Sequence, residues 1–182
     1  MASNVVSRSL HDVGLAAWFG GTLANAVALN AAAAKAGNSR SAGAVANTGW
    51  DRWTPVNAAA IGGHLVGSVG QLLGNRERLT TQQGVGTMAL VKTGVTVAAL
   101  AATGYSRLLG RKVSQQKAVP VADGTTPTTE TPAEVASAQR QLTALQWAVP
   151  ALTGALVVIS AVAGEQQRAS QVVSGLAGRF LR

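Results

Sequence analysis

Four long stretches of the chain carry almost no charge. They are residues 13–34, 53–75, 79–106 and 141–164. Lys92 and His64 are the only basic side chains in them, and neither aspartate nor glutamate occurs there. At about 1.5 Å per residue, each stretch is long enough as a helix to cross a hydrocarbon core of about 30 Å. A soluble helix of this length would need a charged outer face, so the pattern predicts four transmembrane helices.

The pattern of apolar residues and helix-breaking residues sets the expected boundaries. We expect helices at about 10–34, 55–73, 85–109 and 132–164, within one membrane domain that covers residues 1–182. Pro55 suits the first turn of the second helix, where its missing N–H costs nothing. Trp50 and Trp53 precede it, where an aromatic belt is expected at the membrane surface.

A Thr- and Pro-rich segment separates the last two helices. Residues 112–131 predict a flexible linker. Thr131-Pro132-Ala133-Glu134 has the form of a capping box with Pro at the first helical position. We therefore expect a helix to begin outside the membrane near Pro132 and to continue into the fourth span, with a kink at Pro150.

Both ends of the chain leave an alternative open. Residues 166–182 place apolar side chains at helical spacing between arginines, which predicts an interfacial helix or a frayed extension of the fourth span. The first apolar stretch resembles a signal peptide, but Trp18 and Gly20 interrupt it, and we interpret it as a retained helix. The predicted fold is thus an all-α integral membrane four-helix bundle with an extramembrane extension of its fourth helix and a C-terminal amphipathic helix.

Composition narrows the classes of function. Only 12% of residues are charged, against about 25% in a typical soluble domain. The net charge of +8 comes from Lys and Arg residues that flank the apolar stretches. Their position predicts contact with lipid headgroups and argues against nucleic acid as a partner. With no cysteine and two histidines, the chain predicts no metal site, and we expect no cofactor. No acid lies within helical reach of His64 and Ser68, so we expect no hydrolase site and no enzymatic activity.

Polar residues recur at seven-residue spacing in each predicted helix, which keeps one seam facing inward in a left-handed bundle. The rows are His11, Trp18 and Asn25; Asn57, His64 and Gln71; Thr96 and Thr103, with Lys92 one turn earlier; and Gln139, Gln146, Thr153, Ser160 and Gln167. Polar groups within lipid need partners, so these rows are expected to face one another, either as structural hydrogen bonds or as a hydrated path. The candidate polar site is Lys92, His64, Asn25, Gln71 and Thr96.

Lys92 is the most informative of these residues, because an unpaired ammonium inside a membrane costs several kcal/mol. By its position in the helix, it lies near the level of His64 and within reach of Asp12 and Glu165. We expect either a structural ion pair with one of these acids or a proton- or anion-responsive site with His64. His11 is expected near the membrane surface, well above His64, which excludes a bis-histidine haem within one chain.

A strip of glycines follows the polar row of the second helix. It consists of Gly63, Gly67, Gly70 and Gly74. Small residues four apart let two helices approach closely within a membrane. The strip therefore predicts a packing face for a neighbouring helix or for another subunit.

The run from Leu10 to Gly21 includes His11 at the helix start and Trp18-Phe19-Gly20-Gly21 one heptad later. It resembles the opening helix of copper-resistance D-like proteins and of other small four-helix bacterial membrane families. If the chain were related to the copper-resistance family, only His11 and residues 18–21 would correspond to that family's pattern. With Met1 and Met88 as its only methionines, the chain lacks the soft ligands expected of a copper handler.

The sequence leaves three functions open. The first is a non-enzymatic membrane protein that acts through helix packing, as an accessory or assembly subunit or as a homo-oligomer. The second is a small-solute or ion transporter or channel that uses Lys92 and His64. A cofactor-binding electron-transfer subunit is a third and weaker alternative. In each case we expect a multi-pass protein of a bacterial inner membrane, with both termini on one side.

Overall fold

The computed structural model describes residues 4–116 and 119–167, and the regular structure in them is helical. The elements are α1 (Val5–Ala24), η1 (Asn25–Leu29), α2 (Asn30–Ala33), α3 (Ser39–Gly74), α4 (Arg76–Thr81), α5 (Val85–Gln115) and α6 (Ala133–Glu165). The expected interfacial helix at 166–182 lies, apart from Gln166 and Gln167, outside the described residues. η1 is a π-helical turn whose flanking residues keep helical backbone angles, so α1, η1 and α2 form one continuous rod.

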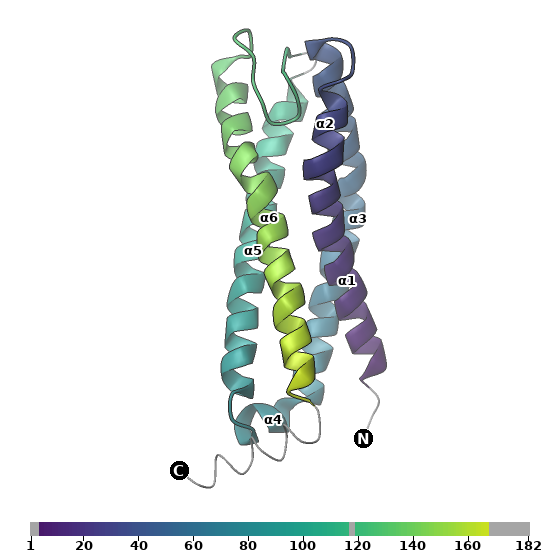
Figure 1. The fold of residues 1–182 in the computed structure, drawn as a ribbon, viewed down its shortest axis with the longest axis vertical. Helices are drawn as coiled ribbons and strands as arrows, with labels where there is room; N and C mark the ends of the chain where they lie inside the picture. Colours follow the sequence, from purple (N-terminus) through teal and green to yellow (C-terminus); the bar gives the residue numbers. More distant parts are fainter. Residues whose placement is uncertain (1–3, 117–118, 168–182) are drawn as a thin grey trace.

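The long helices lie side by side and alternate in direction (Figure 1). α1 packs mainly on α3, and α5 packs mainly on α6, while α1 and α6 join these two pairs. α3 and α5 make little contact with each other. The start of α1, the short α4 and the end of α6 share one end of the molecule, and the α2–α3 turn and the loop before α6 share the other.

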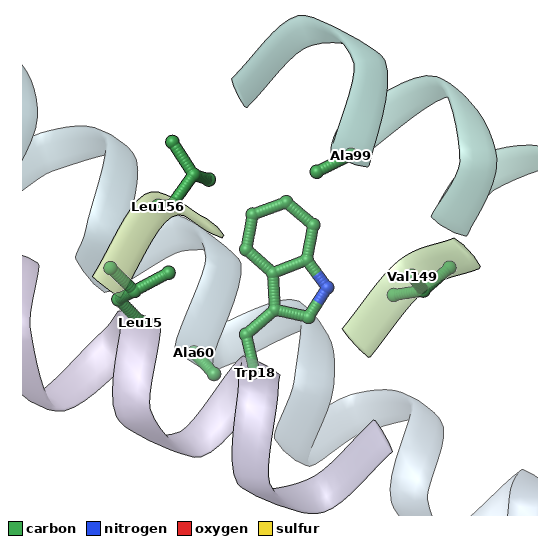
Figure 2. Close-up of a cluster of buried hydrophobic side chains, with 6 residues drawn as sticks. All are labelled: Leu15, Trp18, Ala60, Ala99, Val149 and Leu156. Atoms are coloured by element: carbon green, nitrogen blue, oxygen red, sulfur yellow. The ribbon is translucent and has the colours of Figure 1, made fainter. Parts of the chain in front are cut away.

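A small apolar core holds the helices together at mid-length. Trp18 of α1 is fully buried and is surrounded by Leu15, Ala60, Ala99, Val149 and Leu156 (Figure 2). These residues come from α1, α3, α5 and α6, so the indole ring contributes to the packing of each long helix. A second cluster joins α5 to α6 near the loop end through Leu109, Val113, Val135 and Ala138.

Three helical stretches are long and apolar enough to cross a membrane: Val5–Ala33, Val85–Gln115 and Ala133–Glu165. α3 is not among them, although its second half coincides with the expected second span. Glycines and the polar residues Asn57, His64 and Gln71 lower the hydropathy of that half. Four membrane-crossing helices were predicted, and three of the long helices have the length and apolar composition that a crossing needs.

The expected start of the second helix is wrong. α3 begins at Ser39, because the side chain of Asn38 accepts hydrogen bonds from the backbone N–H groups of Arg40 (3.1 Å) and Ser41 (2.9 Å). Pro55 therefore lies inside the helix and not in its first turn. Proline is a strong helix-start signal only when no earlier cap competes with it, and here Asn38 is the earlier cap.

The segment before α6 also differs from the expected extended linker. α5 continues to Gln115, and residues 119–131 fold back as a compact loop with a bridge between Val121 and Pro127. Val121 is buried, and its N–H donates to the carbonyl oxygen of Ser39 (3.3 Å). Asp123 holds the turn by accepting from the N–H groups of Thr125 (2.7 Å) and Thr126 (2.8 Å).

The start of α6 was predicted correctly to within one residue, but by the wrong mechanism. Pro132 occupies the cap position and α6 is continuous from Ala133 across residues 136–142, as predicted. The Thr131 hydroxyl does not cap it; it donates to the carbonyl oxygen of Pro120 (2.5 Å) and accepts from the N–H of Thr128 (2.8 Å). Thr131, the first residue of the capping-box motif, therefore stabilises the loop before α6 and does not cap the helix.

The two ends of the described chain meet, as expected from an even number of long helices. Arg8 donates to the side chain of Gln167 (2.7 Å). Arg78 of α4 donates to the carbonyl oxygen of Gln166 (2.9 Å), and Gln82 donates to the same oxygen (3.1 Å). α4 therefore satisfies a carbonyl group that the end of α6 leaves without a helical partner.

Candidate functional site

The two histidines of the chain lie against each other in the core. His11 of α1 is 1% exposed and His64 of α3 is fully buried, and their ring centroids are 4.5 Å apart. Trp18 approaches His64 edge-on, with 6.0 Å between the ring centroids. The expectation that His11 lies well above His64 is wrong, because α1 and α3 are antiparallel neighbours and the first turns of α1 lie beside the last third of α3.

Close approach of the two backbones makes this contact. A Cβ atom on Gly14 would lie 2.5 Å from the backbone nitrogen of His64, and one on Gly67 would lie 2.3 Å from that of His11. Each histidine is thus opposite a glycine of the other helix. Only the absence of a side chain at these two positions lets the helices approach this closely.

The hydrogen bonds fix which ring nitrogen carries the proton in each neutral imidazole. Nδ1 of His11 lies 2.6 Å from Oδ1 of Asp12, and Nδ1 of His64 lies 3.4 Å from the carbonyl oxygen of His11. Carboxylate and carbonyl oxygens only accept, so both Nδ1 atoms donate. Among residues 4–116 and 119–167, neither buried Nε2 atom has a hydrogen-bond partner, and each presents a lone pair.

Lys92 lies half-buried on α5, near this pair, but it forms no ion pair within the described residues. The expected pairing with Asp12 is replaced by the bond of that carboxylate to His11, although Asp12 remains the carboxylate whose charge acts on Lys92. Glu165 is exposed near the end of α6. Lys92, His64 and His11 therefore form one electrostatic group, with the charges of Asp12 and Arg8 at its edge.

The remaining members of the predicted polar site do not join this group. The Thr96 hydroxyl donates to the carbonyl oxygen of Lys92 in its own helix (2.9 Å). The amide nitrogens of Asn25 and Gln71 are buried, and neither has a hydrogen-bond partner in the part of the chain that the structure describes. The seven-residue spacing identified inward-facing positions, but it did not identify which of them meet.

Two contacts join the polar row of α1 to the rows of α3 and α5. Trp18 Nε1 donates to the hydroxyl of Thr103 (3.2 Å), which joins α1 to α5. His11 and His64 join α1 to α3. Thr153 is fully buried but bonds to the carbonyl oxygens of Val149 (2.8 Å) and Pro150 (3.3 Å) in its own helix.

Sequence reasoning missed a hydrogen-bonded chain at the loop end. Trp50 Nε1 donates to Oδ1 of Asn30 (3.1 Å), and Nδ2 of Asn30 donates to Oε1 of Gln146 (2.7 Å). Gln146 Nε2 donates in turn to the hydroxyl of Thr125 (3.3 Å). Asn30 is one of two asparagines in the first uncharged stretch, so the sequence marks it as a buried polar residue. Its partners Trp50 and Gln146 lie 20 and 116 residues away, and the sequence does not reveal them.

The glycine strip is occupied within the chain. Gly67, Gly70 and Gly74 of α3 face the backbone of His11 and the side chains of Ser7 and Asn4, and Gly63 faces the carbonyl oxygen of Leu10. The expectation of a packing face is therefore met by α1. The strip is not free to hold another subunit.

Metal-binding chemistry is limited in this core. Among residues 4–116 and 119–167, no three His, Cys, Asp or Glu residues lie close enough to hold a metal ion.

No protein-family model, curated protein or solved structure matches the chain. The resemblance of residues 10–21 to small bacterial membrane families stays a prediction.

Proposed function

We propose that this chain is a small, non-enzymatic protein of a bacterial inner membrane, crosses the bilayer with four helices, and acts as an accessory subunit by packing against other membrane subunits. The outward apolar surface of α5 is the observation that carries the proposal. Only 11% of the apolar window of α5 is buried within the chain. Leu90, Val97 and Leu108 are 75%, 59% and 59% exposed.

The partner surface is expected on α5, because the glycine strip of α3 is already occupied by α1. Because α1 already fills the strip on α3, that face offers no surface to a second copy of the chain. α5 instead presents a long apolar surface that needs lipid or a partner helix. A partner helix against α5 is the arrangement expected of an accessory or assembly subunit.

Extraction from native membranes in a mild detergent tests this function. The intact protein is expected to migrate in a complex larger than the monomer. Val97→Phe on α5 should disrupt that complex, whereas Val66→Phe on α3, 63% exposed in the structure, should leave it intact. Migration as a monomer before any substitution, or equal behaviour of both variants, would refute the proposal.

The buried polar group favours a second candidate function, a carrier for a small solute or ion. The Nε2 atoms of His11 and His64 are buried without a hydrogen-bond partner among the described residues, and the charge of Lys92 acts on both rings. Such groups within a membrane are typical of ion and substrate pathways. In proteoliposomes, Lys92→Met should then abolish a proton- or anion-dependent signal while the exposed control Thr93→Met retains it. The absence of any such signal in the unaltered protein would exclude this candidate.

A further inference from the structure

Two adjoining cavities form a groove between α3 and α5, in the half of the molecule nearer the 119–131 loop. The larger, of about 350 Å³, has mainly apolar walls and reaches Leu100, which packs against the central core. The smaller, of about 240 Å³, has more polar walls and reaches Arg40 and Gln116. The residues that line both cavities are Asn47, Val113 and Ser114. Because α3 and α5 make little contact, the groove separates the α1–α3 pair from the α5–α6 pair.

The groove has the length of one leaflet of a bilayer. From Leu100 to Gln116, α5 advances about 24 Å at 1.5 Å per residue. Half of a bilayer, with its headgroups, measures about 20–23 Å. The apolar cavity occupies the inner part of this length and the more polar cavity the outer part, which is the order of acyl chain and headgroup in a phospholipid.

The charged residues of the groove favour an anion. Among the described residues that line the two cavities, Arg40 and Arg107 carry the positive charges and Asp51 is the only carboxylate. Nη1 of Arg107 donates to Oδ1 of Asp51 (2.8 Å) and so joins α5 to α3. The groove therefore has one positive charge more than its carboxylate neutralises. A headgroup with a single negative charge complements it, whereas a neutral hydroxyl would leave the excess charge uncompensated.

Accessible polar groups surround the ion pair. Nη2 of Arg107 is accessible and donates to no described residue. Asn47 lies one helical turn from Asp51 on α3, and Ser114 lies two turns from Arg107 on α5, so each shares a helix face with a member of the pair. Asn47 and Ser114 are half-buried, and their side chains form no hydrogen bond within the described chain. Guanidinium, amide and hydroxyl groups all donate to phosphate oxygens, and ionised acceptors form the stronger hydrogen bonds.

We propose that the groove binds one anionic phospholipid of the surrounding bilayer. Its phosphodiester accepts from Nη2 of Arg107 and from the amide of Asn47, its headgroup reaches Ser114, and an acyl chain lies in the apolar cavity. A fatty acid held at Arg107 would leave the more polar cavity without an occupant. A headgroup with an ammonium group would place a second positive charge beside Arg40. The inference rests on the membrane location proposed above, but not on a partner helix against α5.

Native mass spectrometry of the delipidated full-length protein in detergent tests the site. The protein is titrated with phosphatidylglycerol, with phosphatidylethanolamine of the same acyl chains, and with the corresponding fatty acid. Phosphatidylglycerol should bind as a single saturable ligand, about ten-fold more tightly than phosphatidylethanolamine. Equal affinities for the two phospholipids would overturn the assigned charge, and equal or tighter binding of the fatty acid would overturn the assignment of a phospholipid.

Two substitutions of the ion pair should change the affinity for phosphatidylglycerol in opposite directions. Arg107→Gln should weaken binding about ten-fold, because it removes the guanidinium. Asp51→Asn should tighten binding, because it releases Nη1 and removes the negative charge from the groove. Loss of structure would weaken binding in both variants, so the opposite signs separate a role in binding from a role in folding.

Arg111→Gln is the matched control for Arg107→Gln. Arg111 lies one turn later on α5, is exposed, and lines neither cavity, so its loss changes the net charge equally and should leave the affinity unchanged. An unchanged affinity in Arg107→Gln, an equal loss in Arg111→Gln, or weaker binding in Asp51→Asn would overturn the proposal.

The apolar cavity has its own test. Gly104→Phe fills this cavity and should weaken binding of phosphatidylglycerol, whereas Gly94→Phe, on the same helix but outside both cavities, should not. Glycerol phosphate in large excess should fail to displace the lipid, because it has no acyl chain. Displacement by glycerol phosphate, or full affinity in Gly104→Phe, would assign the site to a soluble phosphate and overturn the proposal.

The outcomes for the lipid site and for the proposed function can be told apart. Release of the protein from its membrane by alkaline carbonate would refute the membrane location on which both rest. An inserted protein without preference for phosphatidylglycerol would refute the lipid site alone. A protein that leaves native membranes as a monomer but binds phosphatidylglycerol selectively would refute the accessory subunit and support the lipid site.

Discussion

His11 and His64 lie with their ring centroids 4.5 Å apart because each is opposite a glycine of the other helix. Gly67 admits the backbone of His11, and Gly14 admits that of His64. The contact therefore depends on backbone approach as well as on the imidazole rings. Changes at the glycines and at the histidines give separable predictions.

Gly67→Ala should destabilise the protein by about 1–3 kcal/mol, because the added methyl group would overlap the backbone of α1. Gly62→Ala is the matched control: it lies on the same helix, and its added Cβ would meet nothing within 4 Å. Unfolding in mixed micelles measures both. Equal stability of the two variants would show that α1 does not pack on α3 at Gly67.

The two histidines should be energetically coupled. A double-mutant cycle of His11→Ala and His64→Ala is expected to give a coupling free energy of about 0.5–1.5 kcal/mol, since the two rings pack on each other and neither Nε2 bonds to another described residue. The free energies of unfolding of the two single variants, the double variant and the unaltered protein supply the cycle. Strictly additive effects would place the two rings apart.

Loss of Asn30 should loosen the loop end of the molecule. Asn30→Leu removes the bonds to Trp50 and Gln146 and should cost about 1–3 kcal/mol. Hydrogen exchange in residues 119–131 should accelerate, because Gln146 also holds Thr125.

Asn25→Leu provides the control for Asn30→Leu. The amide nitrogen of Asn25 is buried and has no hydrogen-bond partner within the described chain, so removing it should be neutral or stabilising. Destabilisation by Asn25→Leu that equals the effect of Asn30→Leu would contradict the assigned hydrogen bonds.

Cysteine labelling decides whether α3 crosses the membrane. The chain has no natural cysteine, so single variants Lys35→Cys, Thr81→Cys, Gln115→Cys and Gln167→Cys can be labelled one at a time. Four crossings place positions 81 and 167 on one side and positions 35 and 115 on the other. If α3 does not cross, positions 35 and 81 become accessible from the same side.

The sequence by itself determined the helices and their inward faces. Long uncharged stretches predict helices of membrane-spanning length, and three helices of the structure are long and apolar enough to cross a membrane. The seven-residue spacing likewise places Trp18, His64 and Thr153 inward, and all three are fully buried. These properties are local or periodic along one helix, and a single chain records them directly.

Only the tertiary structure decided which of these positions meet. The registry of α1 against α3 depends on Gly14 and Gly67 matching across two helices, and periodicity within either helix does not reveal it. The compact 119–131 loop and the early start of α3 depend on hydrogen bonds such as those from Val121 to Ser39 and from Gln146 to Thr125. The groove at Asn47 and Arg107 exists because α3 and α5 belong to different helix pairs and make little contact. Contacts between distant residues arise from the sum of many weak packing terms, which no local pattern encodes.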